Sequence, residues 1–245
     1  MEAAARVVAE SRAGTTRLSV LHGEAPLLPR QTGPAEVHFV GGAAGPLGGD
    51  RLTIDVVVGA GATLTVRTVA ATLALPHRDG SLSRLAVTVR VEAGGHLAWL
   101  PEPLIAGGRC HHETLSTVDL AAGASLVWRD ELVCGRHGEE PGDARQRTAV
   151  TVDGTPLYVN DLFVGPSAAG WSGPAVLGGA RVSMSVLVAG HEAPPVHPQA
   201  TPTEALMPLA GPGFLVCGVG DEVWRVRQSL EPYLKCLNLP GASAT

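Results

Sequence analysis

Three five-residue links that share one pattern constrain the fold of this chain more than any other feature of its sequence. They occupy residues 59–63, 92–96 and 121–125, and each carries Ala-Gly at its second and third positions. In all three, the apolar residue just before the link and the apolar residue just after it differ by six in residue number. Glycine accommodates the positive φ that a tight reversal needs, so the links predict turns between paired strands.

Apolar residues alternate with other residues in the runs that precede the links, which is typical of half-buried strands. Leu52, Ile54 and Val56 form one such run, and residues 85–91 form another. A leucine follows each of the three links, at positions 64, 97 and 126. A shorter link at 152–157 ends in a fourth leucine, at position 157. A period of about 30 residues indicates supersecondary units that share one core. We therefore predict an all-β fold of stacked antiparallel hairpins that resembles a β-helix or a wrapped sandwich.

A globule of this mass would bury roughly 70% of its unfolded surface, which is ample for a core. The length allows one large all-β domain or two ordinary ones, and we interpret residues 1–245 as a single domain. Residues 1–165 form the hairpin-repeat region, and residues 166–245 are expected to add further strands. The proline-rich segment 194–212 predicts an irregular loop with at most a helical turn around 203–207. A short C-terminal helix is predicted over about 221–231, because Val223, Val226 and Leu230 recur at spacings of three and four. Asp221 would cap this helix and Pro232 would limit it.

Composition and charge exclude several classes of protein. The net charge is −5, and the 18 basic residues, all arginine except Lys235, are scattered, which disfavours a nucleic-acid binder. No apolar run approaches the roughly 20 residues that cross a bilayer, and the first 17 residues lack the apolar core of a secretory signal. The four cysteines are far apart and form no CxxC pair, so reduced thiols are expected. The sequence therefore predicts a cytoplasmic protein.

The segment Cys110-His111-His112-Glu113 holds residue types that suit late first-row divalent metals. On a strand, Cys110 and His112 would share one face while His111 and Glu113 share the other, which leaves two ligands per face. Two interpretations stay open: a polar strand edge, or the metal site of a small cupin-like β-barrel enzyme. A solenoid that binds carbohydrate is disfavoured, because only four tryptophans and two tyrosines are present.

Two glutamates occupy equivalent places in consecutive repeats. Glu102 and Glu131 each lie five residues beyond a repeat leucine, so stacking would place them about 5 Å apart. Like charges this close raise one pKa or attract an arginine or a cation. Two interpretations again stay open: an acidic rim paired with Arg129 or Arg136, or a weak path for a metal ion. The residues of that path are Glu102, Glu131, Asp130, Glu140, His112 and Cys110.

Four segments in order resemble the urease accessory protein UreD (UreH) family. They are Thr16-Arg-Leu18, Gly45-Pro-Leu-Gly-Gly-Asp50, Trp99-Leu-Pro-Glu-Pro-Leu-Ile105, and Arg129-Asp-Glu-Leu-Val-Cys-Gly-Arg136 with Glu139 and Glu140. The resemblance runs to about residue 165 and more loosely to the end. It departs at residues 66–75, where many relatives have Thr-Thr-Gln-x-Ala-Thr-Lys-Val-Tyr. The spacing after Arg136 leaves both Glu139 and Glu140 as matches to the family glutamate.

The resemblance implies a non-enzymatic maturation factor with a largely β-helical fold and a minor helical part. Members of the family bind UreF, which carries the GTPase UreG, and the complex docks on apo-urease to deliver nickel. A dimer of such heterotrimers is also implied. The resemblance further implies no tightly bound cofactor and transient passage of Ni²⁺, for which weak and multiple sites suit handover. The loop 194–212 and the C-terminal helix are the expected partner-contacting segments.

Overall fold

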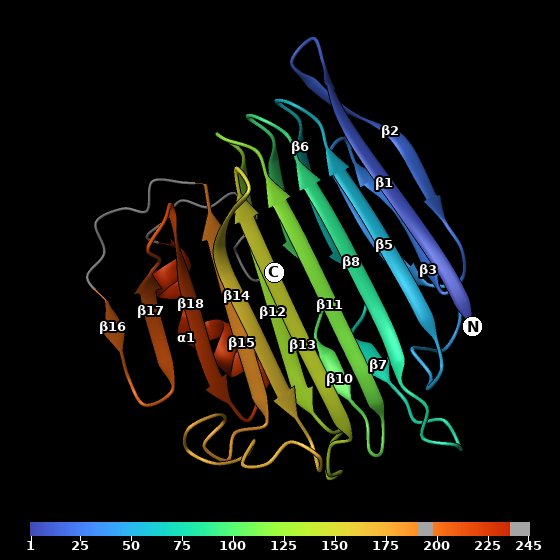
Figure 1. Cartoon of the computed structure of the whole chain (residues 1–245), viewed down its shortest axis with the longest axis vertical. Helices are drawn as coiled ribbons and strands as arrows, with labels where there is room; N and C mark the ends of the chain where they lie inside the picture. Colours follow the sequence, from blue (N-terminus) through green and yellow to red (C-terminus); the bar gives the residue numbers. More distant parts are fainter. Residues whose placement is uncertain (191–197, 236–245) are drawn as a thin grey trace.

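Two large β-sheets pack against each other in the computed structural model, which describes residues 1–190 and 198–235 (Figure 1). The seven-stranded sheet has the order β14 (Thr155–Val164), β13 (Asp143–Val152), β11 (His111–Leu120), β8 (Ser83–Val91), β5 (Arg51–Val58), β1 (Glu2–Arg12) and β2 (Thr15–Gly23). The eleven-stranded sheet runs β16 (Gln199–Ala200), β17 (Glu204–Pro208), β18 (Gly213–Gly220), β15 (Val182–Ala189), β12 (Ser125–Cys134), β9 (His96–Leu100), β6 (Thr63–Thr68), β4 (Glu36–Gly41) and β3 (Leu27–Gly33). In this second sheet, β10 (Leu104–Ala106) pairs with β12 and with β7 (Thr72–Ala74). One helix, α1 (Val223–Lys235), lies within the described ranges. The predicted all-β, β-helix-like class with a short C-terminal helix is confirmed.

The repeated links connect the two sheets, and this corrects the predicted hairpins. The first link leads from β5 to β6, the second from β8 to β9, and the third from β11 to β12, each time from one sheet to the other. Strands of successive units therefore lie parallel, with Leu64 opposite Leu97 and Leu97 opposite Leu126. Alternation and a turn glycine are common to hairpins and to such arches. Which strands pair is decided by contacts with the neighbouring unit, and a local sequence pattern carries no information about those contacts.

Each link closes with the same backbone hydrogen bond, and its shared glycine has the positive φ that was predicted. The closing N–H···O distances are 3.0 Å (Ala62 to Gly59), 2.8 Å (Gly95 to Glu92) and 3.0 Å (Ala124 to Ala121). The φ values are +63° at Gly61, +67° at Gly94 and +75° at Gly123. A four-residue turn with positive φ at its third position favours glycine there.

The parallel stack ends before the fourth repeat leucine, so the prediction of a further unit at Leu157 is wrong. Strand β14 turns back on β13 as an antiparallel hairpin, through Asp153 and Gly154, which both have positive φ. Asp-Gly in a two-residue loop is the usual signature of such a hairpin. In the other sheet, β12 is followed by β15, which pairs with it antiparallel. Antiparallel strands thus close both sheets beyond the last parallel unit.

Apolar residues at equivalent positions of successive strands form columns through the core. In the seven-stranded sheet one valine from each of five parallel strands is paired with the next and almost fully buried: Val7, Val56, Val89, Val118 and Val150. In the facing sheet, the rings of Trp99 and Trp128 stack with centroids 5.1 Å apart. Such a pair contributes about 1 kcal/mol beyond its buried area. The repeat therefore stabilises the fold by placing like residues on like residues.

The C-terminal part differs from its prediction in two places. A strand, β17, replaces the helical turn expected around 203–207, because Leu206 is buried and its backbone pairs with β18. Residues 194–197, the start of the expected loop 194–212, lie outside the described residues, as does Cys236. The helix begins at Val223 and continues past Pro232, and the predicted apolar residues Val226 and Leu230 are buried. None of the described residues forms a helix with the length and apolar character needed to cross a bilayer.

The positive φ of the link glycines is expected to matter more than the space around them. Replacing Gly123 by alanine places a Cβ where no atom lies within 4 Å, so its cost is backbone strain of about 1 kcal/mol. Gly41→Ala is the matched control, because its φ is outside the left-handed region and its nearest neighbour is 3.9 Å away. Urea unfolding measures both variants. Equal stability of the two would contradict the role of the turn.

Candidate functional site

The predicted glutamate pair lies together on the outer face of the eleven-stranded sheet, under α1. Parallel pairing of β9 with β12 brings the two strands side by side at Trp99 and Trp128, a few residues before the glutamates. Arg227 of α1 contacts both carboxylates. Its Nε and Nη2 donate to Glu131 at 2.8 and 2.6 Å, and Nη2 also donates to Glu102 at 3.0 Å. The repeat therefore stacks two like charges, and an arginine distant in sequence binds both of them.

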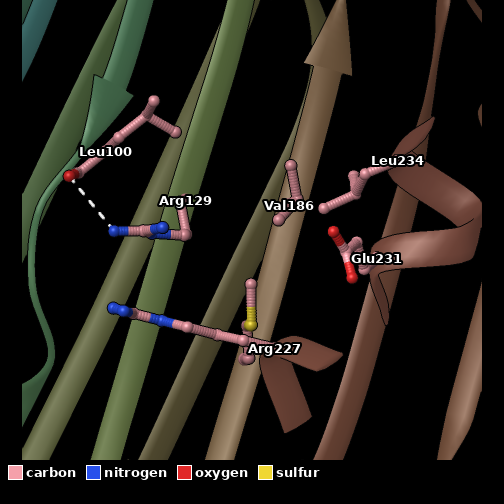
Figure 2. A pocket seen from close by; sticks show the side chains of 7 residues that line it. Leu100, Arg129, Val186, Arg227, Glu231 and Leu234 are labelled. Atoms are coloured by element: carbon pink, nitrogen blue, oxygen red, sulfur yellow. Dashed lines mark hydrogen bonds between the residues drawn. The ribbon is translucent and has the colours of Figure 1, made fainter. Parts of the chain in front are cut away.

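A second arginine, Arg129, lies in the same cluster. Its Nη2 donates to the carbonyl oxygen of Leu100 at 3.2 Å (Figure 2). The same nitrogen donates to the carbonyl oxygen of Pro101 at 2.8 Å. Its guanidinium is 3.5 Å from a carboxylate oxygen of Glu131 and 3.6 Å from one of Glu102. Burial lowers the pKa of Arg129, whereas the hydrogen bonds from Arg227 to Glu131 raise the pKa of Arg227. The predicted pairing with Arg129 is present at longer range, and the close partner is Arg227.

Asp130 belongs to a different environment from Glu131, because successive strand residues point to opposite faces. Its carboxylate lies between the sheets, where it accepts hydrogen bonds from Trp128 Nε1 at 3.0 Å and from Thr148 Oγ1 at 2.7 Å. Thr148 belongs to β13, so this contact joins the two sheets. Burial raises the pKa of Asp130. The structure thus separates Asp130 from the glutamate cluster that is next to it in sequence.

Two cavities reach Asp130, and both are also lined by Gln146. The larger has a volume of about 490 Å³, and the smaller, which includes Tyr158 and Met207 in its lining, of about 420 Å³. Three of the four segments that carry the family resemblance meet at the larger cavity, which is lined by Gly45, Pro46, Trp99, Glu102, Asp130 and Glu131. The segment 66–75, where the chain departs from many relatives, lines it with small and apolar residues from Thr68 to Leu75.

The segment Cys110-His111-His112-Glu113 does not converge on one point. His112 is fully buried, and its two ring nitrogens lie 2.8 Å from Ser83 Oγ and 3.1 Å from Thr114 Oγ1. Burial lowers the pKa of His112 to about 4 and raises that of Cys110 to about 11. The other two side chains point outward, where His111 is exposed and Glu113 pairs with Arg84 at 2.8 Å.

This split leaves the cupin-like metal site without its ligand set. Within residues 1–190 and 198–235, no group of three or more His, Cys, Asp or Glu side chains is arranged to hold a metal ion. The donors near the cavities are instead carboxylates that are already engaged by arginine or hydroxyl groups. Such an arrangement suits brief contact with a cation better than retention of one.

Glu139 and Glu140 differ in their surroundings. Glu139 accepts two hydrogen bonds from Arg136, at 2.8 and 2.7 Å, which hold the pKa of this carboxyl down to about 2. The turn that presents Glu139 is held by Arg181, whose Nη2 donates to the carbonyl oxygens of Cys134, Arg136 and Glu139. Glu140 is exposed in the loop between β12 and β13. Glu139 is therefore the one with a structural role in this turn.

Sequence reasoning missed Arg227, Gln146 and Thr148. A signal for Arg227 exists in the helix, since this residue adjoins the apolar position Val226 and two stacked glutamates need a buried cation. Gln146 and Thr148 lie at alternate positions of β13, a pattern that indicates one common face. Nothing local shows that this face meets Asp130. That contact depends on how the two sheets pack.

Removing the buried glutamate is expected to destabilise the fold far more than removing its neighbour. Glu131→Ala leaves the buried Arg129 and the partly buried Arg227 without their inner carboxylate and should cost about 3–5 kcal/mol. The side chain of Glu102 is 35% exposed, so solvent screens its pairing and Glu102→Ala should cost about 1 kcal/mol or less. Urea unfolding of both variants measures the difference. A larger loss for Glu102→Ala would contradict this description of the cluster.

The buried His112 is expected to make the folded chain less stable as the pH is lowered. Its pKa is about 4 in the folded chain against an ordinary value of 6.5, so the unfolded chain binds the proton first. The stabilising contribution is complete above pH 6.5 and is lost as the pH falls towards 4, by about 2 kcal/mol between pH 7 and 5. His112→Gln should flatten this dependence in thermal unfolding, and the exposed neighbour variant His111→Gln should not. Identical pH profiles for all three proteins would exclude the effect.

Comparison with known proteins agrees with the resemblance read from the sequence. A model described as UreD urease accessory protein matches residues 1–242. The Urease accessory protein UreD of Parafrankia sp. (strain EAN1pec) is 42% identical over 244 residues, which cover 89% of this chain and 82% of the relative. The protein of the same name from Streptomyces coelicolor is 41% identical over 248 residues, covering 97% of each chain. The chain therefore belongs to the UreD urease accessory protein family.

Proposed function

We propose that this chain is a non-catalytic scaffold for nickel delivery to apo-urease. In this proposal it binds UreF and, through UreF, the GTPase UreG, and the assembly pairs into a dimer of heterotrimers in the cytoplasm. Membership of the family supports an accessory role, which implies contact with urease and with other accessory proteins. The ion is cargo, so no resident cofactor is required.

The observation that carries the proposal is the pair of cavities that share Asp130 and Gln146. One water occupies about 30 Å³, so volumes of about 490 and 420 Å³ have room for a hydrated divalent cation. A carboxylate where two cavities meet can replace a water of that cation during passage. Because Asp130 already accepts hydrogen bonds from Trp128 and Thr148, binding there would be weak enough for release.

The predicted metal residues have different roles in this proposal. Asp130, between the sheets, is the one that faces the shared route. Glu102 and Glu131 line the larger cavity, but their carboxylates are held by Arg227. Cys110 and His112 are kept neutral by burial, and His112 is occupied by hydroxyl groups, so neither is assigned to the route. Glu140 is exposed on a loop and is left as a surface carboxylate.

Of the two predicted partner-contacting segments, α1 has the surface better suited to binding UreF. Trp224 is 57% exposed on it, and the guanidinium of Arg225 lies 5.0 Å from the centre of the indole ring. Tryptophan and arginine are enriched among the residues that dominate protein interfaces. The described part of the other segment, residues 198–212, forms the edge strand β16 and its neighbour β17, and the free side of β16 can also pair with a partner.

The route through Asp130 can be tested in a strain that lacks this gene and is complemented with variants. The wild type should restore nickel to urease, whereas Asp130→Asn, which keeps the size of the side chain but replaces one accepting oxygen by an N–H donor, should lower nickel loading by about tenfold. Asp119→Asn is the matched control, because Asp119 is an exposed aspartate on β11. Nickel per urease active site is measured, together with co-purification of UreF and UreG.

Each arm of this experiment bears on one part of the proposal. Full nickel loading with Asp130→Asn would exclude the interior route while leaving the scaffold role intact. Normal urease in the strain without the gene would exclude the accessory function itself. Loss of UreF co-purification with Asp130→Asn would show that the variant disturbs assembly instead of transport.

A further inference from the structure

Helix α1 is held to the sheets by an apolar face and by a charge cluster. Val226, Leu230 and Leu234 are buried against residues of β15 and β18. Beside this face, Arg227 reaches Glu131 and Glu102, which are 96 and 125 positions earlier in the chain. The apolar face is short, so the ion pairs are an important part of the attachment.

Detaching α1 by itself would leave a buried charge behind. The side chain of Glu131 is only 1% exposed, and its closest cation is Arg227. Removing one partner of a buried ion pair is strongly destabilising, because the remaining charge is neither hydrated nor neutralised. Opening of α1 would therefore be rare unless another cation could take the place of Arg227.

Arg129 is placed to be that cation. Its Nε is buried, makes no hydrogen bond, and lies 3.5 Å from the Glu131 oxygen that Arg227 Nε occupies. Its Nη2 stays bonded to the carbonyl oxygens of Leu100 and Pro101, so the group needs only a small movement to reach Glu131. A buried donor without a partner costs free energy, and engaging Glu131 would recover it.

The space for that movement is present. A cavity of about 10 Å³, about the least that admits one water, lies between α1 and the sheet and is lined by Arg129, Arg227 and Met184. In Figure 2 the guanidinium groups of Arg129 and Arg227 extend in the same direction, from β12 and from α1. The two arginines therefore approach one carboxylate from different elements.

We propose that α1 is a releasable latch and that Arg129 is its standby counter-charge. In the closed state Arg227 holds Glu131; in the open state Arg227 leaves with the helix and Arg129 Nε donates to Glu131. The buried charge of Glu131 is neutralised in both states, and Glu102, whose side chain is 35% exposed, is hydrated in the open state. Helix α1 therefore opens as a unit while β9 and β12 stay folded. This inference concerns the attachment of the helix and does not depend on passage of nickel.

Hydrogen exchange of the full chain, read by mass spectrometry on peptides from 223–235 and from β12, tests the latch. In the wild type, α1 should exchange at least about tenfold faster than β12, because it opens without global unfolding. Arg227→Met should speed exchange of α1 by a further factor of about ten and leave β12 protected. Arg225→Met, on the same helix but outside the cluster, is the matched control and should match the wild type.

The decisive variant is Arg129→Gln, which keeps an amide donor for the carbonyl oxygens but removes the standby charge. Because opening would then strand Glu131, α1 should exchange at least about threefold more slowly than in the wild type, relative to β12. A merely structural role for Arg129 predicts exchange that is unchanged or faster, and either result would overturn the proposal. If a variant fails to fold, hydrogen exchange of the wild type still tests the proposal. Equal protection of α1 and β12 would show that the helix opens only when the whole chain unfolds, which would overturn it.

Discussion

In-register parallel pairing between successive units is the constraint on which the rest of the structure depends. Each unit crosses from one sheet to the other through a link, and the backbone groups of one link bond to those of the next, as Gly61 N–H does to Ala93 O at 3.1 Å. Register then forces equivalent positions to stack. A column of valines crosses the seven-stranded sheet and a tryptophan pair forms in the eleven-stranded sheet. Two glutamates meet under α1.

The glutamate pair shows what this constraint costs. Stacking is favourable for valine and tryptophan but unfavourable for like charges, so Glu102 and Glu131 need cations from elsewhere. One arginine comes from the same strand as Glu131, and the other comes from the C-terminal helix. The position of α1 is thereby linked to the register of the repeat. The same cluster that compensates the stacked charges also attaches the helix.

Strand alternation gives β12 two chemical environments at adjacent residues. Glu131 faces the helix in a cluster of ion pairs, while Asp130 faces the other sheet between two cavities. A tight metal cage would require several such donors to converge, and the described residues contain no such group. Polar groups that are each partly satisfied suit a protein whose proposed cargo must leave again.

Much of this was accessible from the sequence, because the signals are local. Alternation, the Ala-Gly links and the repeat of about 30 residues predicted the strands, the positive φ of Gly61, Gly94 and Gly123, and the equivalence of Glu102 with Glu131. The helix was predicted from the spacing of Val226 and Leu230. The family resemblance rested on four short segments, and in the structure three of these line one cavity.

Only the tertiary structure decided which strands pair and which charges meet. A turn glycine fits a hairpin and an arch equally well, so the parallel stack, its end before Leu157 and the strand β17 depend on neighbours distant in the chain. Arg227 reaches its partners across 96 and 125 positions, and Thr148 meets Asp130 across the space between two sheets. The sequence by itself determined the units and their repeated positions, because backbone preference and apolar periodicity are properties of neighbouring residues. Pairing, ion pairs and cavities arise from packing, which brings together residues that no local pattern connects.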